Sequence, residues 1–379
     1  MNKLKYITYQ TFPSSKANSI QTIENLNCLA KYYEVELIYP LRESYSSDDH
    51  NIIKSNYNFE QDIIFSGTNH KLPFGKIRMF EKYLFLISHY FWAKKISKKY
   101  MDCDEYFYFT RSDWIFYFMS KYGHNIIFEC HQLSKLRKFL MKKSIKSKSS
   151  KIIFLNDYLL EDSGVNISEN GKNFKVLHNG VDTNIFKSKK SSNNKKIIFS
   201  GSFSRFNEDR NFDFLLKTFN SNELSDYKLK IIGGTDEEVK VLKNKVTDLN
   251  IKNIEIGKRV SRNHLAKNLE EYEFGLLLNT NKNIHSVKYT SPLKFFEFLS
   301  VGLKVIAVDF PAHRKLPNQE NIFYFNENSK EEFIQALRIG GNTEFKDFSV
   351  YSISLKKRAR EIYDFFNLAR PEGLEPPTL

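Results

Sequence analysis

The chain has 379 residues, of which 41% are hydrophobic and 27% charged, and its formal net charge is +14 at neutral pH. This length predicts about two domains, and the composition is typical of a soluble globular protein, which excludes a disordered or fibrous chain. The three cysteines form no Cys-x-x-Cys pair, so neither a disulfide framework nor a cysteine zinc site is expected. The excess of positive charge favours anionic partners: phosphorylated ligands, anionic lipid or nucleic acid.

The amino-terminal residues lack the apolar core of a signal peptide. The longest charge-free apolar stretch, from Tyr83 to Ala93, is far shorter than the roughly 20 residues that span a bilayer. Sparse cysteines also fit the reducing cytoplasm. We therefore expect a cytoplasmic protein.

The first half of the chain alternates short apolar runs with segments of helical periodicity. Strands are predicted over 4–10, 34–40, 105–110, 125–130 and 151–156. Helices are predicted over 19–33 and 77–96. Apolar runs bounded by polar residues are typical of a parallel sheet that is buried on both faces.

The second half repeats this alternation. Its strands are predicted over 195–202, 228–235, 253–258, 274–280, 304–310 and 321–326. Its helices are predicted over 211–219, 236–249, 262–272, 292–302 and 330–339. Strands that alternate with helices indicate an α/β domain with right-handed crossovers.

The two halves together predict an α/β protein with two Rossmann-like domains that face each other across a cleft lined by strand carboxyl ends. The first domain is expected over 1–178 and the second over 179–345. A further helix is expected within 346–369, packing back on the N-terminal domain. The last residues, 370–379, contain three prolines and no apolar periodicity, so a disordered tail is predicted there.

The best-formed functional signal is the stretch TSPLKFFEFLSVG at 290–302. Ser291 is predicted as the N-cap of a helix, with Pro292 at its first position and Leu293 following, since proline is well tolerated there. The exposed N–H groups and the dipole at such a helix start can bind a phosphate group. This end of the helix is therefore a candidate site for a nucleotide diphosphate.

Two charged residues support that interpretation. Lys294 lies in the first turn, where the dipole normally prefers acids, and a bound anion would account for it. Glu297 lies three residues later and shares its face of the helix. A carboxylate in this place can accept two hydrogen bonds from a ribose diol. The alternative is an ordinary buried helix with a Lys294–Glu297 surface pair.

Several stretches follow one another in an order that points to a family. The first is KVLHNGVDTNIF at 175–186, followed by KKIIFSGSF, KLKIIGG and NIEIGKRV, and then by SPLKFFEFLSVGLKVIAVDFPAHRKL at 291–316. In the N-terminal half, FPSSKANSIQ, FTRS and FECH add weaker likeness. Together they resemble family 4 glycosyltransferases of the GT-B fold, the retaining class common in bacterial polysaccharide pathways. The resemblance covers most residues from 5 to about 335.

That family often carries two glutamates with seven residues between them: the second holds the nucleotide ribose and the first contacts the donor sugar. Glu297 matches the second, whereas Tyr289 stands where the first would be. Many relatives of the SPLKFFE type also lack the first glutamate, so we do not infer an inactive enzyme. The resemblance implies nucleotide binding and leaves the donor sugar open.

The family also carries Gly-Arg after the first strand of its second domain, followed by a lysine. Here the first pair is Gly201-Ser202, and Arg210 stands for the lysine. Arg210 keeps the charge and adds bidentate phosphate geometry. Arg205 is a second candidate, since it can compensate for Ser202. For either arginine, the alternative is a solvated loop charge.

Three residues of the first domain are candidates through the same resemblance. His131, at the carboxyl end of a predicted strand, matches a histidine that reaches the donor sugar; the alternative is a structural histidine. Asn18 and Ser19 precede a predicted helix, in place of a glycine-rich loop, and would line the cleft. For Ser19, helix capping is the equally weighted alternative.

No metal or other cofactor is expected. Asp102-Cys103-Asp104 is an Asp-x-Asp, the metal-binding pattern of the other major glycosyltransferase fold, but it precedes its strand and is interpreted as a surface loop. No cluster of histidine, cysteine and carboxylate residues suggests a metal, and no Gly-x-Ser-x-Gly elbow suggests a hydrolase.

The segment 135–151 holds eight Lys or Arg residues and no acid. With Leu136, Phe139, Leu140 and Ile145 it is predicted to form a basic amphipathic face, which suits an anionic membrane surface. The alternative is a solvated helix. Because no recognised nucleic-acid motif is present, a nucleic-acid partner is not expected.

These features favour a glycosyltransferase that moves a sugar from a nucleotide-sugar donor to a glycan or lipid-linked acceptor, in the synthesis of lipopolysaccharide, capsule or a similar polysaccharide. Arg210 and Lys294 would stabilise the departing diphosphate, Glu297 would anchor the ribose and His131 would orient the sugar. Two alternatives remain: a catalytically silent GT-B subunit that binds a partner or membrane, and a nucleotide-sugar epimerase of related fold.

Overall fold

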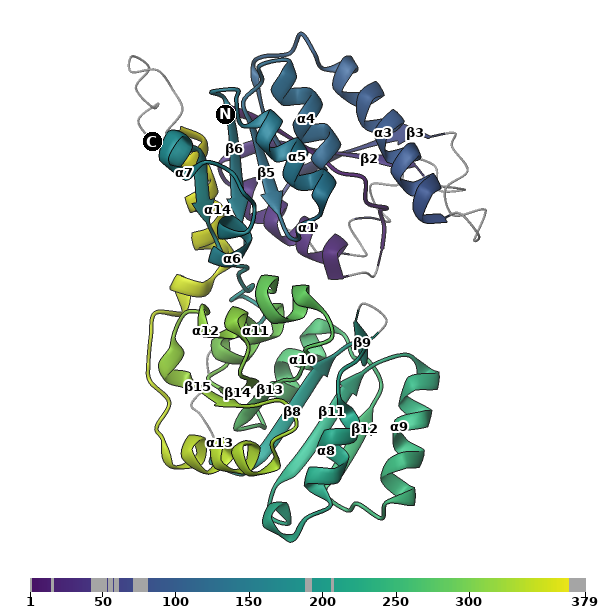
Figure 1. The fold of residues 1–379 in the computed structure, drawn as a ribbon, viewed down its shortest axis with the longest axis vertical. Coiled ribbons are helices and arrows are strands. Elements are labelled where there is room, and N and C mark those ends of the chain that lie inside the picture. Colours follow the sequence, from purple (N-terminus) through teal and green to yellow (C-terminus); the bar gives the residue numbers. More distant parts are fainter. Residues whose placement is uncertain are drawn as a thin grey trace. The chain divides into compact units, whose positions relative to one another are not determined.

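A computed structural model describes residues 2–14, 17–41, 53, 57, 61–70, 81–187, 193–205 and 208–367. The described residues form two compact units. Unit 1 holds the residues up to Leu177 and those from Leu355 onward, and unit 2 holds His178–Ser354. Each unit has its own parallel sheet, which confirms the predicted α/β class (Figure 1). The predicted tail at 370–379 lies outside the described residues.

Unit 1 is built on a seven-stranded parallel sheet with the order β3-β2-β1-β4-β5-β6-β7. The strands are β1 (Asn2–Ile7), β2 (Tyr33–Leu41), β3 (Ile63–Asn69), β4 (Tyr106–Thr110), β5 (Ile126–Cys130), β6 (Ser150–Phe154) and β7 (Phe174–Val176). Every residue of β5 and β6 is buried, as expected of strands covered on both faces. The strand order reverses between β1 and β4, which is where such sheets place their ligands.

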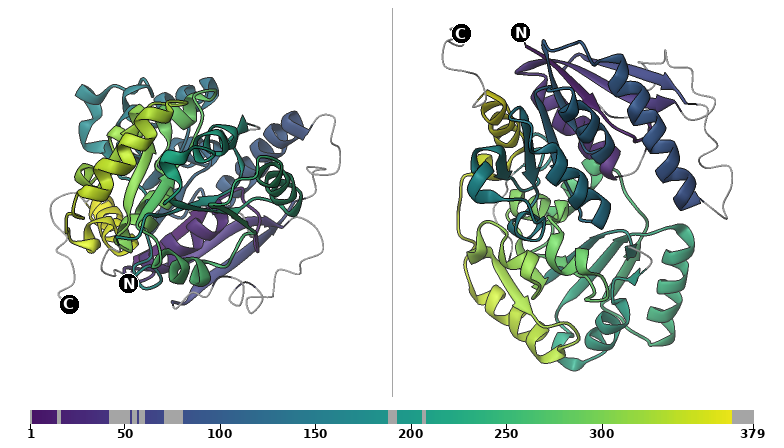
Figure 2. Two further views of the ribbon diagram at one scale, coloured as in Figure 1. Left: turned by 90° about the horizontal axis from the view of Figure 1, so that it is seen from below. Right: turned by 45° about the horizontal axis from the view of Figure 1, so that its top comes forward.

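Helices cover both faces of this sheet. They are α1 (Ala17–Leu29), α3 (Glu81–Lys99), α4 (Asp113–Lys121), α5 (Lys135–Ser144), α6 (Asp157–Glu161), α7 (Ile167–Asn170) and α14 (Leu355–Asn367). Helix α4 lies between α3 and α5 on one face, and α1 packs with α14 on the other (Figures 1 and 2). Ser112 and Ser134 cap α4 and α5, because each hydroxyl accepts a backbone N–H of the first turn.

The carboxyl-terminal helix α14 is held to unit 1 by an apolar face. Ala359, Ile362 and Phe366 share one buried cluster with Leu26 and Leu29 of α1. The residues just before α14 belong to unit 2, where Val181 pairs with Ser354.

Unit 2 has a six-stranded parallel sheet with the order β12-β11-β8-β13-β14-β15. Its strands are β8 (Lys196–Gly201), β11 (Lys228–Gly233), β12 (Ile254–Gly257), β13 (Phe274–Leu277), β14 (Lys304–Val308) and β15 (Ile322–Phe325), beside a small hairpin of β9 (Ser204–Arg205) and β10 (Glu208–Asp209). Its α-helices are α8 (Phe212–Phe219), α9 (Asp236–Asp248), α10 (Arg262–Leu269), α11 (Leu293–Ser300), α12 (Pro311–Arg314) and α13 (Lys330–Asn342). The order reverses between β8 and β13.

The end of β11 depends on a glycine. Gly233 has φ +134°, and a Cβ placed on it would lie 1.8 Å from the carbonyl oxygen of Gly201, at the end of β8. Only glycine fits such a position. The two backbones therefore approach closely at the carboxyl edge of this sheet.

The start of α11 differs from the prediction. The helix begins at Leu293, with Pro292 as its N-cap, and Ser291 lies outside it. Ser291 contacts Asn179 instead of the helix: its Oγ accepts the N–H of Asn179 (3.1 Å), and its carbonyl accepts Asn179 Nδ2 (2.6 Å). The predicted capping role of Ser291 is therefore wrong.

Within the described ranges, no helix combines the length and the apolar character needed to cross a bilayer.

Candidate functional site

A cavity of about 470 Å³ opens in unit 1 at the carboxyl ends of β1, β4 and β5, where the strand order reverses. Asn18, Arg111, Glu129 and His131 line one part of it, and Phe85, Leu86, Trp114 and Leu136 line another. A concave site with an apolar wall and a few convergent polar groups is typical of small-ligand binding.

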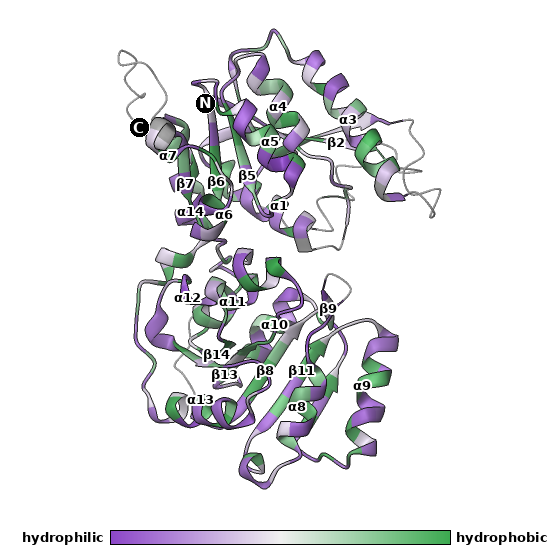
Figure 3. Cartoon of the chain, in the orientation of Figure 1, coloured by the Kyte–Doolittle hydropathy of each residue, from purple (hydrophilic) through white to green (hydrophobic). Residues whose placement is uncertain are grey.

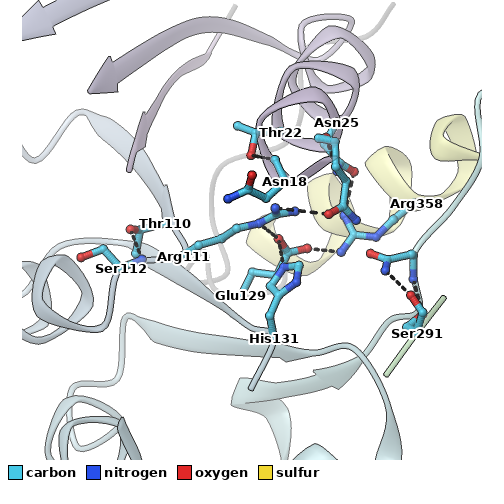
Figure 4. A network of polar contacts seen from close by, with 12 residues as sticks. Asn18, Thr22, Asn25, Thr110, Arg111, Ser112, Glu129, His131, Ser291 and Arg358 are labelled. Carbon is cyan, nitrogen blue, oxygen red and sulfur yellow. Dashed lines mark hydrogen bonds and ion pairs between the residues drawn. The ribbon is translucent and has the colours of Figure 1, made fainter. Parts of the chain in front are cut away.

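The polar part of the cavity is organised around a buried carboxylate (Figure 4). Glu129, near the carboxyl end of β5, accepts a hydrogen bond from Arg111 Nε (2.5 Å) and one from His131 Nε2 (2.9 Å). Arg358 of α14 donates to its other oxygen and to Asn25 Oδ1 of α1 (2.9 Å). The cluster thus joins the sheet to α1 and α14 and fixes the direction of the His131 ring.

The charges in this cluster are strongly perturbed. Burial would raise the pKa of Glu129, but Arg111, Arg358 and His131 outweigh it and hold that pKa well below its usual range. Burial, with the positive charge of Arg111, lowers the pKa of His131 to about 4 despite the attraction of Glu129. The pair is therefore a carboxylate and a neutral imidazole at pH 7.

These protonation states determine which group donates the hydrogen bond between Glu129 and His131. Because the Glu129 carboxylate only accepts, His131 must donate from Nε2, which leaves Nδ1 as a hydrogen-bond acceptor. The side chain of His131 keeps 27% of its surface accessible at the cavity. His131 can therefore accept a hydrogen bond from a ligand hydroxyl.

Asn18 and Ser19 lie within the first turn of α1, which begins at Ala17, rather than before the helix as predicted. Asn18 lines the cavity, and its Oδ1 accepts the backbone N–H of Ser19 (3.0 Å). Ser19 is buried, and its hydroxyl is directed at the carbonyl of Thr11 (3.5 Å). The structure thus places Asn18 at the cavity, whereas Ser19 is buried and does not line it.

Unit 2 gathers the other candidate residues at the carboxyl edge of its sheet. Gly201 ends β8, Ser202 follows it, and the β9–β10 hairpin then carries Arg205, with Arg210 directly after it. Arg205 Nη1 donates to Thr290 Oγ1 (3.3 Å), just ahead of α11. The hairpin therefore brings Arg205 to the loop that leads into α11.

Arg210 is held by the residues that follow β13. Its Nη1 donates to the carbonyl of Leu278 (3.0 Å) and to Asn279 Oδ1 (3.4 Å). Burial, with the positive charge of Arg205 nearby, lowers the pKa of Arg210 to about 10. Asp209, next to Arg210, opposes this shift but does not cancel it. Two arginines that lose solvation close to each other form a site that an anion would stabilise.

Glu297 is the buried acid of this edge. Lys294 Nζ lies 2.5 Å from Glu297 Oε2, as the spacing of three residues predicted, and Arg262 Nη2 lies 3.7 Å from Oε1. Burial lowers the pKa of Arg262, against the attraction of Glu297. The oxygens of Glu297 thus lie between two cations, where they can also accept hydrogen bonds from a ligand diol.

Tyr289 closes a π-helical turn, His285–Tyr289, directly before the α11 loop. It lies at the position where the resemblance places the first glutamate. Single π-turns of this kind are frequent at functional sites.

The whole chain superimposes on solved structures of low sequence identity. One is the Anabaena protein Alr3699/HepE in complex with UDP and glucose, with a TM-score of 0.64 at 12% identity, covering 97% of this chain and 100% of that one. A sucrose-phosphate synthase from Thermosynechococcus elongatus gives 0.63 at 12%, covering 97% and 95%. The lipopolysaccharide outer core galactosyltransferase WaaB gives 0.62 at 12%, covering 96% and 97%.

The chain has the GT-B fold. No protein-family model and no curated protein matches the sequence. At these identities, the likeness establishes the architecture and not the activity.

In this GT-B chain, the Asp-x-Asp does not line the cavity of unit 1. Asp102 and Asp104 are exposed in the loop before β4, at the amino end of that strand, and Asp104 pairs with His124 (3.0 Å). Across the described part of the chain, no group of three His, Cys, Asp or Glu side chains is arranged to hold a metal ion.

The basic segment 135–151 differs in part from its prediction. Leu140 of α5 and Ile145, directly after the helix, are buried, so of the four predicted apolar residues Leu136 and Phe139 are exposed. Lys151 is buried in β6, where its amino group donates to the carbonyl of Phe365. The predicted amphipathic face is therefore narrower than expected, although its exposed residues remain basic.

Four polar residues of the two candidate sites escaped sequence reasoning: Arg111, Glu129, Arg262 and Arg358. Glu129 did carry a signal, since an acid inside the apolar run NIIFEC has to find buried cations. Arg358 carried none, because its partners are more than 200 residues away in the chain.

Proposed function

We propose that this protein is a retaining glycosyltransferase, of the family 4 type, that transfers a sugar from a nucleotide-sugar donor to a glycan or lipid-linked acceptor in cell-surface polysaccharide synthesis. The observation that carries the proposal is the carboxyl edge of the unit 2 sheet, where the buried Glu297 lies between Lys294 and Arg262 and where Arg205 and Arg210 are gathered. A nucleoside diphosphate has a ribose diol, which an acid can bind, and a diphosphate group, which cations can bind.

The similar structures give this proposal its substrate class. One of them was solved with UDP and glucose, and another is a galactosyltransferase of the lipopolysaccharide outer core. We infer that the donor of this chain is likewise a nucleotide-linked sugar, and that its acceptor belongs to a cell-surface polysaccharide.

In the proposed reaction, most of the rate comes from positioning and from electrostatic stabilisation of the leaving diphosphate. Arg210 and Lys294, together with the N–H groups at the start of α11, would meet the charge that develops on it. Glu297 would hold the ribose. His131, with Nδ1 as acceptor, would orient a hydroxyl of the sugar. No metal takes part in this proposal.

The second candidate is a catalytically silent GT-B subunit, and Tyr289 in place of the first glutamate is its support. A nucleotide-sugar epimerase is the third; the HNGVD junction at 178–182 disfavours it.

The test is release of nucleoside diphosphate from a panel of UDP-, GDP-, ADP- and TDP-sugars, measured without acceptor. An active transferase hydrolyses its own donor slowly, and Arg210→Ala should reduce that release at least tenfold. Arg338→Ala, an exposed arginine of α13 in the same unit, is the matched control and should leave it unchanged. If nucleotide sugars bind but none is turned over, the hypothesis of a catalytically silent GT-B subunit replaces this proposal.

A further inference from the structure

Helix α3 presents an apolar stripe to solvent. Tyr83, Leu86, Ile87 and Phe91 expose between 41% and 68% of their surface, and they lie on one side of the helix at helical spacing. Figure 3 shows this apolar part as the green turns of α3. Large exposed hydrophobic residues are unremarkable singly, but four on two to three turns form a patch that needs a partner.

The same side of unit 1 carries a second apolar surface on α5. Leu136 and Phe139 expose 38% and 55% of their surface. Helix α4 lies between the two: it packs against both α3 and α5, and its Trp114 lies edge-on to Tyr90 of α3 (4.8 Å). Helices α3, α4 and α5 therefore form one continuous surface, which we call the α3–α5 face.

The α3–α5 face continues into the cavity of unit 1. Leu86 and Leu136 are exposed on the face and also line the cavity, together with Trp114. The polar Glu129 and His131 line the same cavity. An amphiphilic ligand fits a cavity with this lining. Its hydroxyls can bind to the two polar residues, while its apolar chain leaves the cavity over the two leucines.

The charges on the α3–α5 face select the partner. The exposed lysines of α3 follow its apolar stripe, and those of α5 and the turn after it flank Phe139; they are Lys94, Lys95, Lys98, Lys99, Lys135, Lys142, Lys143, Lys146 and Lys148. Among described residues, Glu81 at the start of α3 is the exposed acid of α3 and α5, and the next exposed acids follow α3 at Asp102, Asp104 and Glu105. Asp113 of α4 is half-buried and pairs with Arg137 of α5 (3.4 Å). Apolar residues surrounded by lysines match the boundary layer of an anionic bilayer.

We propose that the α3–α5 face docks on an anionic membrane surface with the cavity mouth at the lipid boundary, so that the acceptor is a lipid-linked molecule whose chain passes over Leu86 and Leu136. This inference rests on the proposed function for its acceptor, whereas the docking itself does not. It extends the membrane contact from α5 alone to three helices.

The two tryptophans of the chain allow a direct test. Trp114 lines the cavity on the α3–α5 face, whereas Trp92 is 1% exposed and donates to Thr68 inside unit 1 (2.8 Å). Vesicles of phosphatidylglycerol with brominated acyl chains quench only indole groups close to the lipid. We expect them to quench the parent protein, and Trp114→Phe to remove most of that quenching.

Two sets of variants separate charge from apolar contact. Replacing Lys142, Lys143, Lys146 and Lys148 with glutamine should weaken vesicle binding about a hundredfold or more at low salt. Ile87→Ser with Phe91→Ser should weaken binding at all salt concentrations. Val241→Ser, an equally exposed apolar residue of unit 2, is the control and should bind as the parent does.

Some outcomes overturn the proposal. Absence of quenching in the parent, or quenching that persists in Trp114→Phe, excludes docking through this face. If Ile87→Ser with Phe91→Ser instead abolishes self-association in size-exclusion chromatography, the face is a protein interface. Because quenching needs no donor, a protein that releases nucleoside diphosphate but is not quenched keeps its proposed function and loses this inference.

Discussion

Glu297 offers the sharpest test of the nucleotide site, since one substitution removes its charge and little of its shape. In Glu297→Gln, the two hydrogen bonds proposed to reach a ribose diol lose their charge-assisted character. A bond to a charged group is worth about 1.5–3 kcal/mol and a neutral one about 0.5–1.5 kcal/mol. The loss is therefore about 1 kcal/mol for each bond, and the two together should weaken binding of the cognate nucleoside diphosphate about thirtyfold.

Stability should change little in Glu297→Gln, because Lys294 and Arg262 keep 29% and 26% of their side-chain surface accessible and can turn to water. The matched control is Glu273→Gln in the same unit. Glu273 pairs with Lys304 Nζ (2.9 Å), of which only 6% is exposed, at the amino end of the sheet. Removing one partner of such a buried pair costs about 3–5 kcal/mol. That control should lower the melting temperature by about 10 °C and leave the affinity of the folded protein unchanged.

Isothermal titration calorimetry with UDP, GDP, ADP and TDP measures the affinities, and circular dichroism measures the melting temperatures. The reasoning is refuted if Glu297→Gln binds the cognate nucleotide as tightly as the parent, or if Glu273→Gln loses affinity by the same factor. In either case Glu297 is a structural ion-pair residue.

The other predictions concern charge, pH and the anchoring of α14. Activity should persist in excess EDTA, and Arg210→Ala should lower kcat far more than Asp102→Asn; if EDTA silences the parent and manganese restores it, the acidic loop must be reconsidered. Because the pKa of His131 is about 4 in the folded protein, against about 6.5 in an unfolded chain, the unfolded state takes up the extra proton as pH falls. Chemical denaturation should therefore show stability that is complete above pH 6.5 and declines towards pH 4, and His131→Asn should flatten that decline. Arg358→Met leaves Glu129 with one fewer cation and should destabilise unit 1 by about 3–5 kcal/mol in urea titrations; an unchanged midpoint would show that Arg111 alone satisfies the carboxylate.

Much of the architecture follows from the sequence, because an apolar run such as IIFEC at 126–130 can only be a buried parallel strand when it alternates with helical periods. The 63–69 strand and α4 escaped prediction. Strand 63–69 lies at the sheet edge with mostly half-exposed residues, so its apolar signal is weak. The aromatic residues of α4 are divided between core and surface, which blurs its period.

In the candidate sites, the predictions that succeeded depend on residues close together in the chain, and those that failed depend on distant ones. The shared face of Lys294 and Glu297 was predicted because the two residues are three positions apart in one helix; the ion pair between them is what the alternative of an ordinary helix expected. Ser291 was misassigned because its partner, Asn179, is 112 residues away in the chain, and a tertiary hydrogen bond replaced the local cap. Leu140 was misassigned because periodicity defines an apolar face without saying whether it meets core or solvent.

The central claim, a retaining sugar transfer from a nucleotide donor, is tested most directly by a time course of proton NMR spectra with the donor that the release assay identifies. The anomeric signal of the donor should disappear while a product signal appears with the same anomeric configuration. His131→Ala should slow both changes at least tenfold, and His264→Ala, an exposed histidine of unit 2, should slow neither. An initial product of inverted configuration contradicts the retaining mechanism, and a donor signal that stays unchanged with every nucleotide sugar contradicts the transferase itself.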